Sequence, residues 1–439
     1  MTVVREISGW GRWPRRICTL ETPRDPAAAA AAAARPGAMI ARGLGRAYGD
    51  AALNPDRTVA ADRLNRFESF DPDTGVLIAE AGVSLAEIIE TFLPRGFFPA
   101  VTPGTKFVTL GGAIAADVHG KNHHAVGSFG DHVLWLDLAT AGGVRRCSPD
   151  ASPDLFNATI GGMGLTGIVL RAAIGLMRVQ SGWMRQRTVV APDLSAAIAV
   201  FEGNLHVPYS VAWIDCLATG TARGRSLVYL GDHAGADDLD GAAPFDIPHR
   251  AARSMPVDAP SGALNRWSVR AFNAAYFRAG ARKPAEALVD WDRYFYPLDA
   301  IHGWNRIYGR RGFAQHQCAL PLATSQDALA QMLDAIAASG LGSFLAVLKR
   351  FGPGAPQRPL SFPIEGYTLA LDLPLTGDAL TLMDRLDDIV VAAHGRIYLA
   401  KDARMTQRTF ESGYGPRLGA FAAMTNPSFS SLQSKRLGL

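Results

Sequence analysis

Glycines gather in a segment that is suited to binding an anion. Gly43, Gly45 and Gly49 lie between Arg42 and Asp50, directly after a short apolar run. Glycine lets the backbone approach a ligand closely, and successive N–H groups then form a phosphate-binding nest. The spacing G-x-G-x-x-x-G, followed by a turn at Asn54-Pro55-Asp56, does not fit a nicotinamide-binding Rossmann unit, which needs a helix there. Taken alone, the segment leaves an ordinary tight loop as an equal alternative.

Two more glycine-rich segments follow. Residues 162–167, GMGLTG, match G-x-G-x-x-G, but a helical segment precedes them and a strand follows, so an ordinary turn is the fair alternative. The stretch from Pro103 to His132 is rich in Gly and Thr and holds four of the ten histidines within fourteen positions. So dense a polar mixture suits a backbone wrapped round a large polar cofactor, with His119 and Lys121 facing it.

Zinc ligation is the alternative for these histidines, since His119 and His123 stand at i, i+4. Gly120 argues against a regular helix between them, and neither a cysteine nor an H-E-x-x-H motif completes a site. We therefore expect no metal.

Polar side chains interrupt apolar, strand-like runs in the C-terminal half. They occur at Trp304-Asn305-Arg306, Gln315-His316-Gln317, Lys349 and Lys401-Asp402. A polar group within such a run is costly unless it is hydrogen-bonded. We predict a pocket for a hydroxylated, anionic ligand lined by Gln315, Gln317, Lys349 and Lys401, with outward-facing strand positions as the alternative for each. The sequence contains no P-loop and no G-x-S-x-G motif, and it has no obvious Cys–His pairing that would indicate nucleophilic catalysis.

Length and composition indicate a two-domain globular protein. The chain has 439 residues, which is more than one hydrophobic core usually supports. Its composition, 48% hydrophobic and 19% charged, is that of a globular protein. The net charge of +4, without a basic stripe, argues against nucleic-acid binding. No apolar run reaches about 18 residues and residues 1–14 are not a secretory signal, so we expect a cytoplasmic protein, with peripheral membrane contact left open. Four widely spaced cysteines predict buried, reduced thiols.

Helical and strand-like patterns are mixed along the chain, without an internal repeat. Helices are predicted at Ala27–Ala34 (capped by Asp25), at Leu85–Phe92 after a Ser84 capping box, and at Asp154–Thr159, Leu194–Glu202, Val269–Phe277, Gln326–Ala338 and Leu380–Ala393. Strands are predicted at Ala38–Ala41, Thr58–Ala61, Val76–Ala81, Val133–Thr140, Val144–Cys147, Ile168–Leu176, Tyr209–Cys216, Ser226–Leu230, Gly312–Leu320, Phe344–Phe351 and Tyr367–Leu373. We expect a cofactor domain over residues 1–176 and a substrate domain over 177–375. Residues 376–439 are expected to return to the cofactor interface, with a strand at Arg396–Lys401.

Three segments together resemble the FAD-binding domain of the vanillyl-alcohol-oxidase superfamily: ARGLGRAYGD (41–50), PGTKFVTLGGAIAADVHGKNHHAVGSFGDHV (103–133) and GGMGLTGIV (161–169). With FYPLD, GWNRIYG, GFAQHQ, FLAVLKRFGP, SFPIEGY and RIYLAKDAR, nearly the whole chain resembles the decaprenylphosphoryl-β-D-ribose 2-oxidase family. This resemblance implies a two-domain α+β fold of the PCMH type. FAD would lie between an N-terminal cofactor domain and a substrate domain built on an antiparallel sheet.

The resemblance also implies the site residues. Cofactor contacts fall on Ala41, Arg42, Gly43, Leu44, Gly45, Arg46, Ala47, Tyr48, Gly49, Asp50 and Ala51 for the pyrophosphate, and on Gly104, Thr109, Leu110, Gly111, Gly112, Ala116, Asp117, Val118, His119, Ile168 and Tyr398 for the flavin. Catalytic roles fall on Lys401, His119 and Tyr48, and substrate contacts on Lys121, Gln315, Gln317, Lys349, Thr368 and Ala370.

In this family the substrate is a polyprenyl-phosphate pentose. Its 2-hydroxyl becomes a ketone, which a partner short-chain dehydrogenase then reduces, so that ribose is epimerised to arabinose. Two departures matter. Many superfamily members tether FAD through a histidine in the first glycine loop, where this chain has Arg46, Ala47 and Tyr48, so we expect non-covalent FAD. Asn and Cys of the family are replaced by Thr368 and Ala370, which leaves the exact sugar open.

Two other functions compete with this interpretation. One is an oxidase of the same superfamily that acts on a soluble polyol or aldonolactone. The other is a flavin-binding partner or sensor without redox catalysis, against which the presence of Lys401 and the two glutamines argues.

Overall fold

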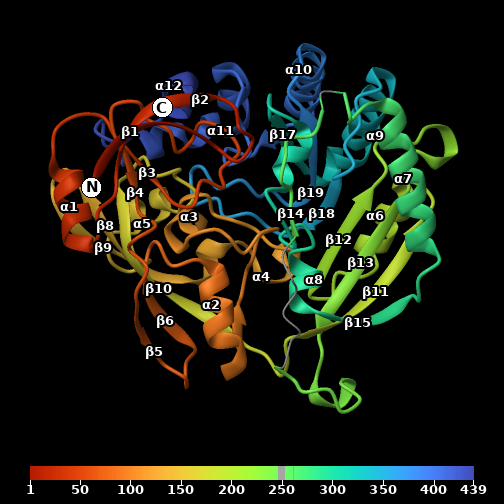
Figure 1. Ribbon diagram of the computed structural model, residues 1–439, viewed down its shortest axis with the longest axis horizontal. Coiled ribbons are helices and arrows are strands. Elements are labelled where there is room, and N and C mark those ends of the chain that lie inside the picture. Colours follow the sequence, from red (N-terminus) through yellow and green to blue (C-terminus); the bar gives the residue numbers. More distant parts are fainter. Residues whose placement is uncertain (246–252, 261) are drawn as a thin grey trace.

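The computed structural model describes residues 1–245, 253–260 and 262–439, and the chain forms two lobes (Figure 1). The N-terminal lobe contains a four-stranded and a six-stranded sheet, and the second lobe is built on one eight-stranded sheet. Every pair of neighbouring strands in the large sheet is antiparallel. The expected two-domain α+β fold is confirmed.

The four-stranded sheet opens the N-terminal lobe. Its order is β1 (Thr2–Ser8), β2 (Arg15–Glu21), β4 (Thr58–Ala60) and β3 (Ile40–Arg42). Helix α1 (Pro26–Ala34) follows β2, and the Asp25 side chain caps it by accepting a hydrogen bond from Ala28 N, as predicted. Alanines on its inner face pack on the six-stranded sheet. The hairpin of β1 and β2 was not predicted, because arginines interrupt its apolar alternation.

The six-stranded sheet carries the elements that lead to the glycine-rich segments. Its strands are β5 (Phe67–Phe70), β6 (Val76–Glu80), β10 (Ile168–Arg178), β8 (Val133–Thr140) and β9 (Gly143–Cys147), with β7 (Phe97–Pro99) paired to β10. The predicted hairpin of β8 and β9 and the predicted capping box of α2 (Leu85–Phe92) are both confirmed. The short helices α3 (Leu110–Ala115), α4 (His123–Val126) and α5 (Pro153–Thr159) connect these strands, and α3 was not predicted because two glycines open it.

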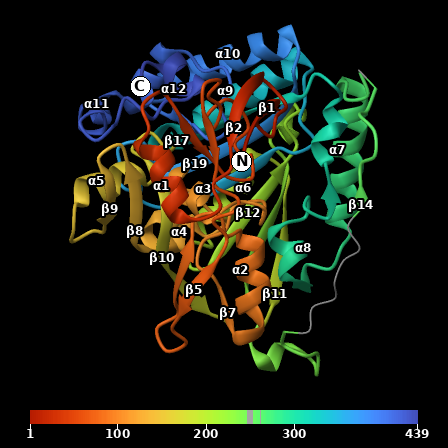
Figure 2. The same ribbon diagram turned by 60° about the vertical axis from the view of Figure 1, so that its left-hand side comes forward.

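The large sheet has the order β15 (Glu286–Asp290), β11 (Trp183–Ala191), β13 (Ser226–His233), β12 (Tyr209–Ile214), β18 (Val347–Phe351), β19 (Gly366–Pro374), β17 (Phe313–Pro321) and β20 (Arg396–Ile397). Helices α6 (Leu194–Glu202), α9 (Leu322–Ser339) and α10 (Gly377–Ala392) form one apolar core with one face of it. The other face is turned toward the N-terminal lobe. Helices α7 (Arg266–Ala281) and α8 (Trp291–Phe295) lie at its margin, beside the small pair β14 (Arg253–Ser254) and β16 (Ile301–His302) (Figure 2).

The C-terminal segment joins both lobes. Helix α10 packs on α9 and β20 pairs with β17, whereas α11 (Gln407–Ala422) and α12 (Leu432–Leu437) lead back to the first lobe. There Ser430 N donates to Met39 O and Asn54 Nδ2 donates to Ser430 O, at 2.8 and 2.7 Å. The strand expected at Arg396–Lys401 is shorter than predicted, because the chain turns after Ile397 and Lys401 N donates to Tyr398 O.

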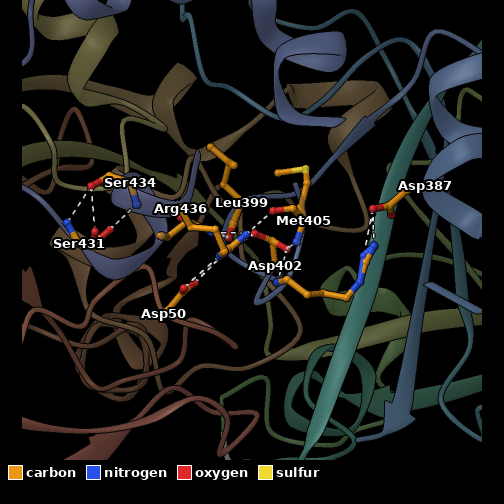
Figure 3. A network of polar contacts seen from close by, with 10 residues as sticks. Asp50, Asp387, Leu399, Asp402, Met405, Ser431, Ser434 and Arg436 are labelled. Carbon is orange, nitrogen blue, oxygen red and sulfur yellow. Dashed lines mark hydrogen bonds and ion pairs between the residues drawn. The ribbon is translucent and has the colours of Figure 1, made fainter. Parts of the chain in front are cut away.

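A buried ion cluster ties this return to the first lobe (Figure 3). Arg436 Nη2 lies 2.8 Å from Asp50 Oδ1 and 2.8 Å from Asp402 Oδ2. The two aspartates are 4% and 3% exposed, and the guanidinium supplies a cation between their buried carboxylates. Since Asp50 ends the first glycine loop and Asp402 follows Lys401, Arg436 links two segments to which chemistry was assigned.

Replacing Arg436 should therefore destabilise the fold strongly. In Arg436→Met, two buried carboxylates face each other without a cation, and we expect a loss of about 3–5 kcal/mol in unfolding free energy at neutral pH. Burial already raises the pKa of Asp50, so the loss should shrink as the pH falls and a carboxyl group takes up a proton. Urea unfolding at two pH values measures both effects. Lys435→Met, at an exposed neighbour, is the control, and equal midpoints for the two variants would contradict the role of the cluster.

Candidate functional site

A cavity of about 1020 Å³ lies between the lobes. All three glycine-rich segments reach it: residues 41–48 of the first, residues 103–121 in part from the long one, and Met163, Gly164 and Gly167 from the third. The polar runs of the C-terminal half add Trp304, Gln315, Gln317, Lys349 and Lys401. Segments separated by more than 300 residues of sequence thus form one wall, and their polar residues share one site.

The first glycine loop has the features of an anion-binding nest. Within the described residues, the backbone N–H groups of residues 43–47 donate no hydrogen bond to protein. A Cβ at Gly43 would overlap the Thr109 hydroxyl, and Gly45 has φ +68° with its Cα against the Arg42 guanidinium. Free amides and positive φ are what a phosphate-binding loop requires. The residues present therefore fit a pyrophosphate.

Five of the expected cofactor residues do not line the cavity. Leu110 and Ile168 belong to the hydrophobic core, and Asp50 pairs with Arg436. Asp117 accepts hydrogen bonds from Gly130 N at 2.9 Å and from Ser361 Oγ at 2.6 Å. Gly49 packs so closely on Asp402 that a Cβ there would overlap its carbonyl oxygen. These five residues, expected to contact the cofactor, thus lie behind the wall of the cavity and support it.

The remaining expected residues all line the cavity, and strand pairing explains how the sheet presents them. In β17, Gln315 and Gln317 point to the cavity. His316 between them points the other way, toward α10, where its Nε2 lies 3.0 Å from Asp387 Oδ1. Gln315 is paired with Asp372 of β19, and Lys349 of β18 is paired with Thr368. The expected substrate residues of three strands therefore share one face of the sheet.

Asp372 is a site residue that the sequence analysis missed. The resemblance had assigned Thr368 and Ala370 to the substrate. Asp372 stands two positions after Ala370 in β19, so strand alternation from these two residues would have identified it. Its carboxylate accepts a hydrogen bond from Gln315 Nε2, and it is almost fully buried. Burial raises the pKa of Asp372, and Lys401 together with Gln315 opposes that rise. Gln315 Oε1 has no partner within the described chain and is free to accept from a ligand hydroxyl.

Three lysines contribute positive charge to the cavity. Burial and the nearby ammonium of Lys349 lower the pKa of Lys121 to about 7, and burial lowers that of Lys349 to about 8. Burial also lowers the pKa of Lys401, although Asp372 partly opposes this shift. Lys401 Nζ lies 3.7 Å from the ring centroid of Tyr48, in a cation–π contact. A bound anion would compensate these charges.

His119 is neutral in this environment. It packs among the rings of Phe351, Phe362 and Tyr398, and burial, aided by Lys349, lowers its pKa well below 6.5. Gln317 Nε2 lies 3.1 Å from His119 Nε2 and donates to it, so the imidazole holds the amide in place. His119 Nδ1 has no partner within the described residues.

Comparison with known proteins assigns the chain to a family. A family model described as an FAD binding domain matches residues 14–148. The chain is 37% identical over 434 residues to decaprenylphosphoryl-β-D-ribose oxidase from Mycolicibacterium smegmatis, covering 95% of this chain and 93% of that protein. The chain belongs to the decaprenylphosphoryl-β-D-ribose oxidase family. It is therefore an FAD-dependent oxidoreductase, which excludes the alternative of a flavin protein without redox function.

Other relatives of this family member differ in how much of the chain they match. An uncharacterised protein of Streptomyces coelicolor is 35% identical over 377 residues, which are 81% of this chain and 100% of that one. L-gulonolactone oxidase from Scyliorhinus torazame is 29% identical over 135 residues, 30% of each chain. The similarity to the lactone oxidase is thus confined to part of each chain.

The structure also bears on membrane and metal binding. In the described ranges no helix has both the length and the hydropathy of a membrane span. Nor do three or more His, Cys, Asp or Glu side chains converge as metal ligands in that part of the chain. The four cysteines are free and buried, as predicted.

We expect FAD to be held without a covalent bond. The loop offers no histidine or cysteine, and the described cavity wall contains no cysteine and one histidine, His119, which aromatic rings and Gln317 enclose. Denaturing the purified holoenzyme and filtering it should release the flavin absorbance into the filtrate. Yellow colour that stays with the denatured chain, and is lost in His119→Gln, would contradict this expectation.

Proposed function

We propose that this FAD-dependent oxidoreductase oxidises the C2 hydroxyl of a polyprenyl-phosphate pentose to a ketone. This would be the first half of a ribose-to-arabinose epimerisation. The observation that carries the proposal is the charge of the cavity, where Lys121, Lys349 and Lys401 outnumber the two carboxylates of the described wall, Asp372 and Asp299. An ammonium cluster within a largely apolar wall favours a substrate with both a phosphate and a hydrocarbon part. The full-length similarity to decaprenylphosphoryl-β-D-ribose oxidase supports the same substrate class.

The cavity residues would divide the tasks of binding and orientation. Lys121 and Lys349 would hold the phosphate, and the unpartnered Oε1 of Gln315 would accept from a sugar hydroxyl. The loop of residues 41–48 would hold the pyrophosphate of FAD, which supplies hydride acceptance when bound. Fixing the alcohol in one orientation removes much of the entropic barrier to this reaction.

Lys401 would stabilise negative charge on the substrate oxygen as the hydroxyl proton is released to water in the cavity. Tyr48 lies beneath its ammonium, and Asp372 favours its protonated form, so the charge is positioned before the reaction begins. His119, held neutral by burial, would fix Gln317 rather than exchange protons. The ketone product would then need a reductase, for which a short-chain dehydrogenase partner is the natural class.

A soluble polyol or aldonolactone is the second candidate substrate. The observation that favours it is the departure at Thr368 and Ala370. Thr368 Oγ1 accepts from Gln317 Nε2 at 3.2 Å, so this departure changes the hydrogen bonding of a residue proposed to bind the substrate. The two candidates differ in whether the lipid phosphate is required.

Anaerobic flavin bleaching distinguishes the two substrates. The holoenzyme is mixed in detergent with a polyprenyl-phosphoryl ribose and, separately, with free polyols and aldonolactones. We expect the lipid-linked ribose alone to bleach the flavin, because only it carries the anion that the lysines require. Bleaching by free polyols or lactones alone would overturn the proposed substrate and favour the second candidate.

Lys401→Ala should slow flavin reduction while FAD stays bound. Losing a preorganised charge at a developing oxyanion costs about 10²–10³ in rate. In the parent enzyme, the rate should fall as the pH rises through the pKa of Lys401, which lies below the usual lysine range, and this alkaline limb should vanish in the variant. Stopped-flow reduction across pH measures both effects, with Lys435→Ala as control. A near-normal rate in Lys401→Ala would refute its role.

A further inference from the structure

Helix α7 presents an apolar face to solvent. Trp267, Phe272 and Tyr276 are 69%, 44% and 38% exposed, and Ala271, Ala275 and Ala279 between them are exposed as well. At 100° per residue these six positions lie within one half of the helix surface. Exposed aromatic side chains on a single helix face are uncommon on a monomeric protein unless that face meets a partner or a membrane.

The opposite side of α7 is firmly anchored, so the exposure is a stable feature. Val269 is buried, and Gly280 packs on Leu227 of β13. Asn273 is fully buried and its Nδ2 donates to Asp215 Oδ1 at 2.8 Å. The helix is thus held to the sheet by one edge, and the remaining surface faces outward (Figure 2).

The charged residues of α7 and its flanking turns have one sign. Residues 262–285 contain Arg266, Arg270, Arg278, Arg282 and Lys283 and no Asp or Glu. Within the described residues none of these five forms an ion pair. A helix with aromatic residues and an uncompensated basic set matches the pattern of helices that lie in the surface of an anionic bilayer.

The same face borders the mouth of the cavity. Phe272, Tyr276 and Ile301 are exposed and also line the cavity, so the cavity opens beside α7. Leu264, Val269 and Phe344 continue the apolar wall inward from this opening. A hydrocarbon chain leaving the cavity here would pass directly along the α7 face.

We propose that the exposed face of α7, comprising Trp267, Ala271, Phe272, Ala275, Tyr276 and Ala279 with Arg278 and Arg282 beside it, docks on an anionic membrane surface and delivers a lipid-linked substrate to the cavity mouth. The delivery part rests on the proposed function, because only a lipid-linked substrate resides in the bilayer. The arginines bind lipid phosphates, and Trp267 enters the interface between headgroups and acyl chains.

Flotation of the full-length holoenzyme with vesicles tests the docking. Vesicles of phosphatidylcholine alone are compared with an equal mixture of phosphatidylcholine and phosphatidylglycerol, at low and high salt. The test variant is W267S/R278E/R282E, whose side chains do not line the cavity. The matched control is I17S/R16E/R24E, which reverses two exposed arginines of the other lobe as well, and Ile17 of β2 is about as exposed as Trp267.

We expect the parent and control proteins to float with the mixed vesicles at low salt and to bind less at high salt. The α7 variant should partition at least about tenfold less, since each basic residue near an anionic surface contributes roughly fivefold. No flotation of the parent protein, or equal flotation of the α7 and control variants, would overturn the proposal. A dimer in sedimentation that W267S/R278E/R282E abolishes, without vesicle binding, would assign the face to a second copy and also overturn it.

Failure of the docking and failure of the proposed function remain distinct. Lipid-linked ribose that bleaches the flavin in detergent, with no flotation, would leave the proposed function intact and refute the docking. Flotation by the α7 face without bleaching would support the docking and refute the substrate.

Discussion

One guanidinium holds together the parts from which the site is made. Arg436 binds Asp50, at the end of the first glycine loop, and Asp402, next to Lys401. The two segments also touch directly, where Tyr48 N donates to Ala400 O at 2.9 Å. Such close contact between two carboxylate-bearing segments is tolerable only because a cation lies between them. The position of Lys401 relative to the glycine loop, and with it the shape of the cavity, depends on this cluster.

The electrostatics of the cavity follow from burial. Lysines placed inside a largely apolar wall lose hydration, so their pKa values fall toward neutrality. The two carboxylates of the described wall, Asp372 and Asp299, do not compensate the three ammonium groups. This costs the ligand-free protein stability and leaves binding energy for an anion. The backbone amides of the glycine loop likewise have no protein partner in the described chain and are available to bind an anion. Because of both features, the empty site has uncompensated positive charge and unpaired donors, and it favours negatively charged ligands.

Local patterns predicted much of the fold, and long-range geometry limited the rest. The capping box at Ser84 and the apolar runs of β17 and β19 were sufficient for their elements, because period and cap chemistry are local. Helix α3 was not predicted, because its two glycines disfavour a helix and tertiary contacts stabilise it instead. Each glycine-rich segment and each polar run of the C-terminal half had an ordinary structural alternative, and only the resemblance to the family assigned them to one site. Gly49, Leu110 and Ile168 lie behind the cavity wall rather than on it, because neighbours in sequence can occupy opposite sides of a wall.

The return of the C-terminal segment to the first lobe has a consequence for biosynthesis. Residues from both extremes of the chain meet at Met39, Asn54 and Asp50, so the contact order of the N-terminal lobe is high. Until α12 has been synthesised, Asp50 lacks the guanidinium of Arg436, and the glycine loop lacks this support. The last segment of the chain to be made thus supplies a contact on which the first lobe depends.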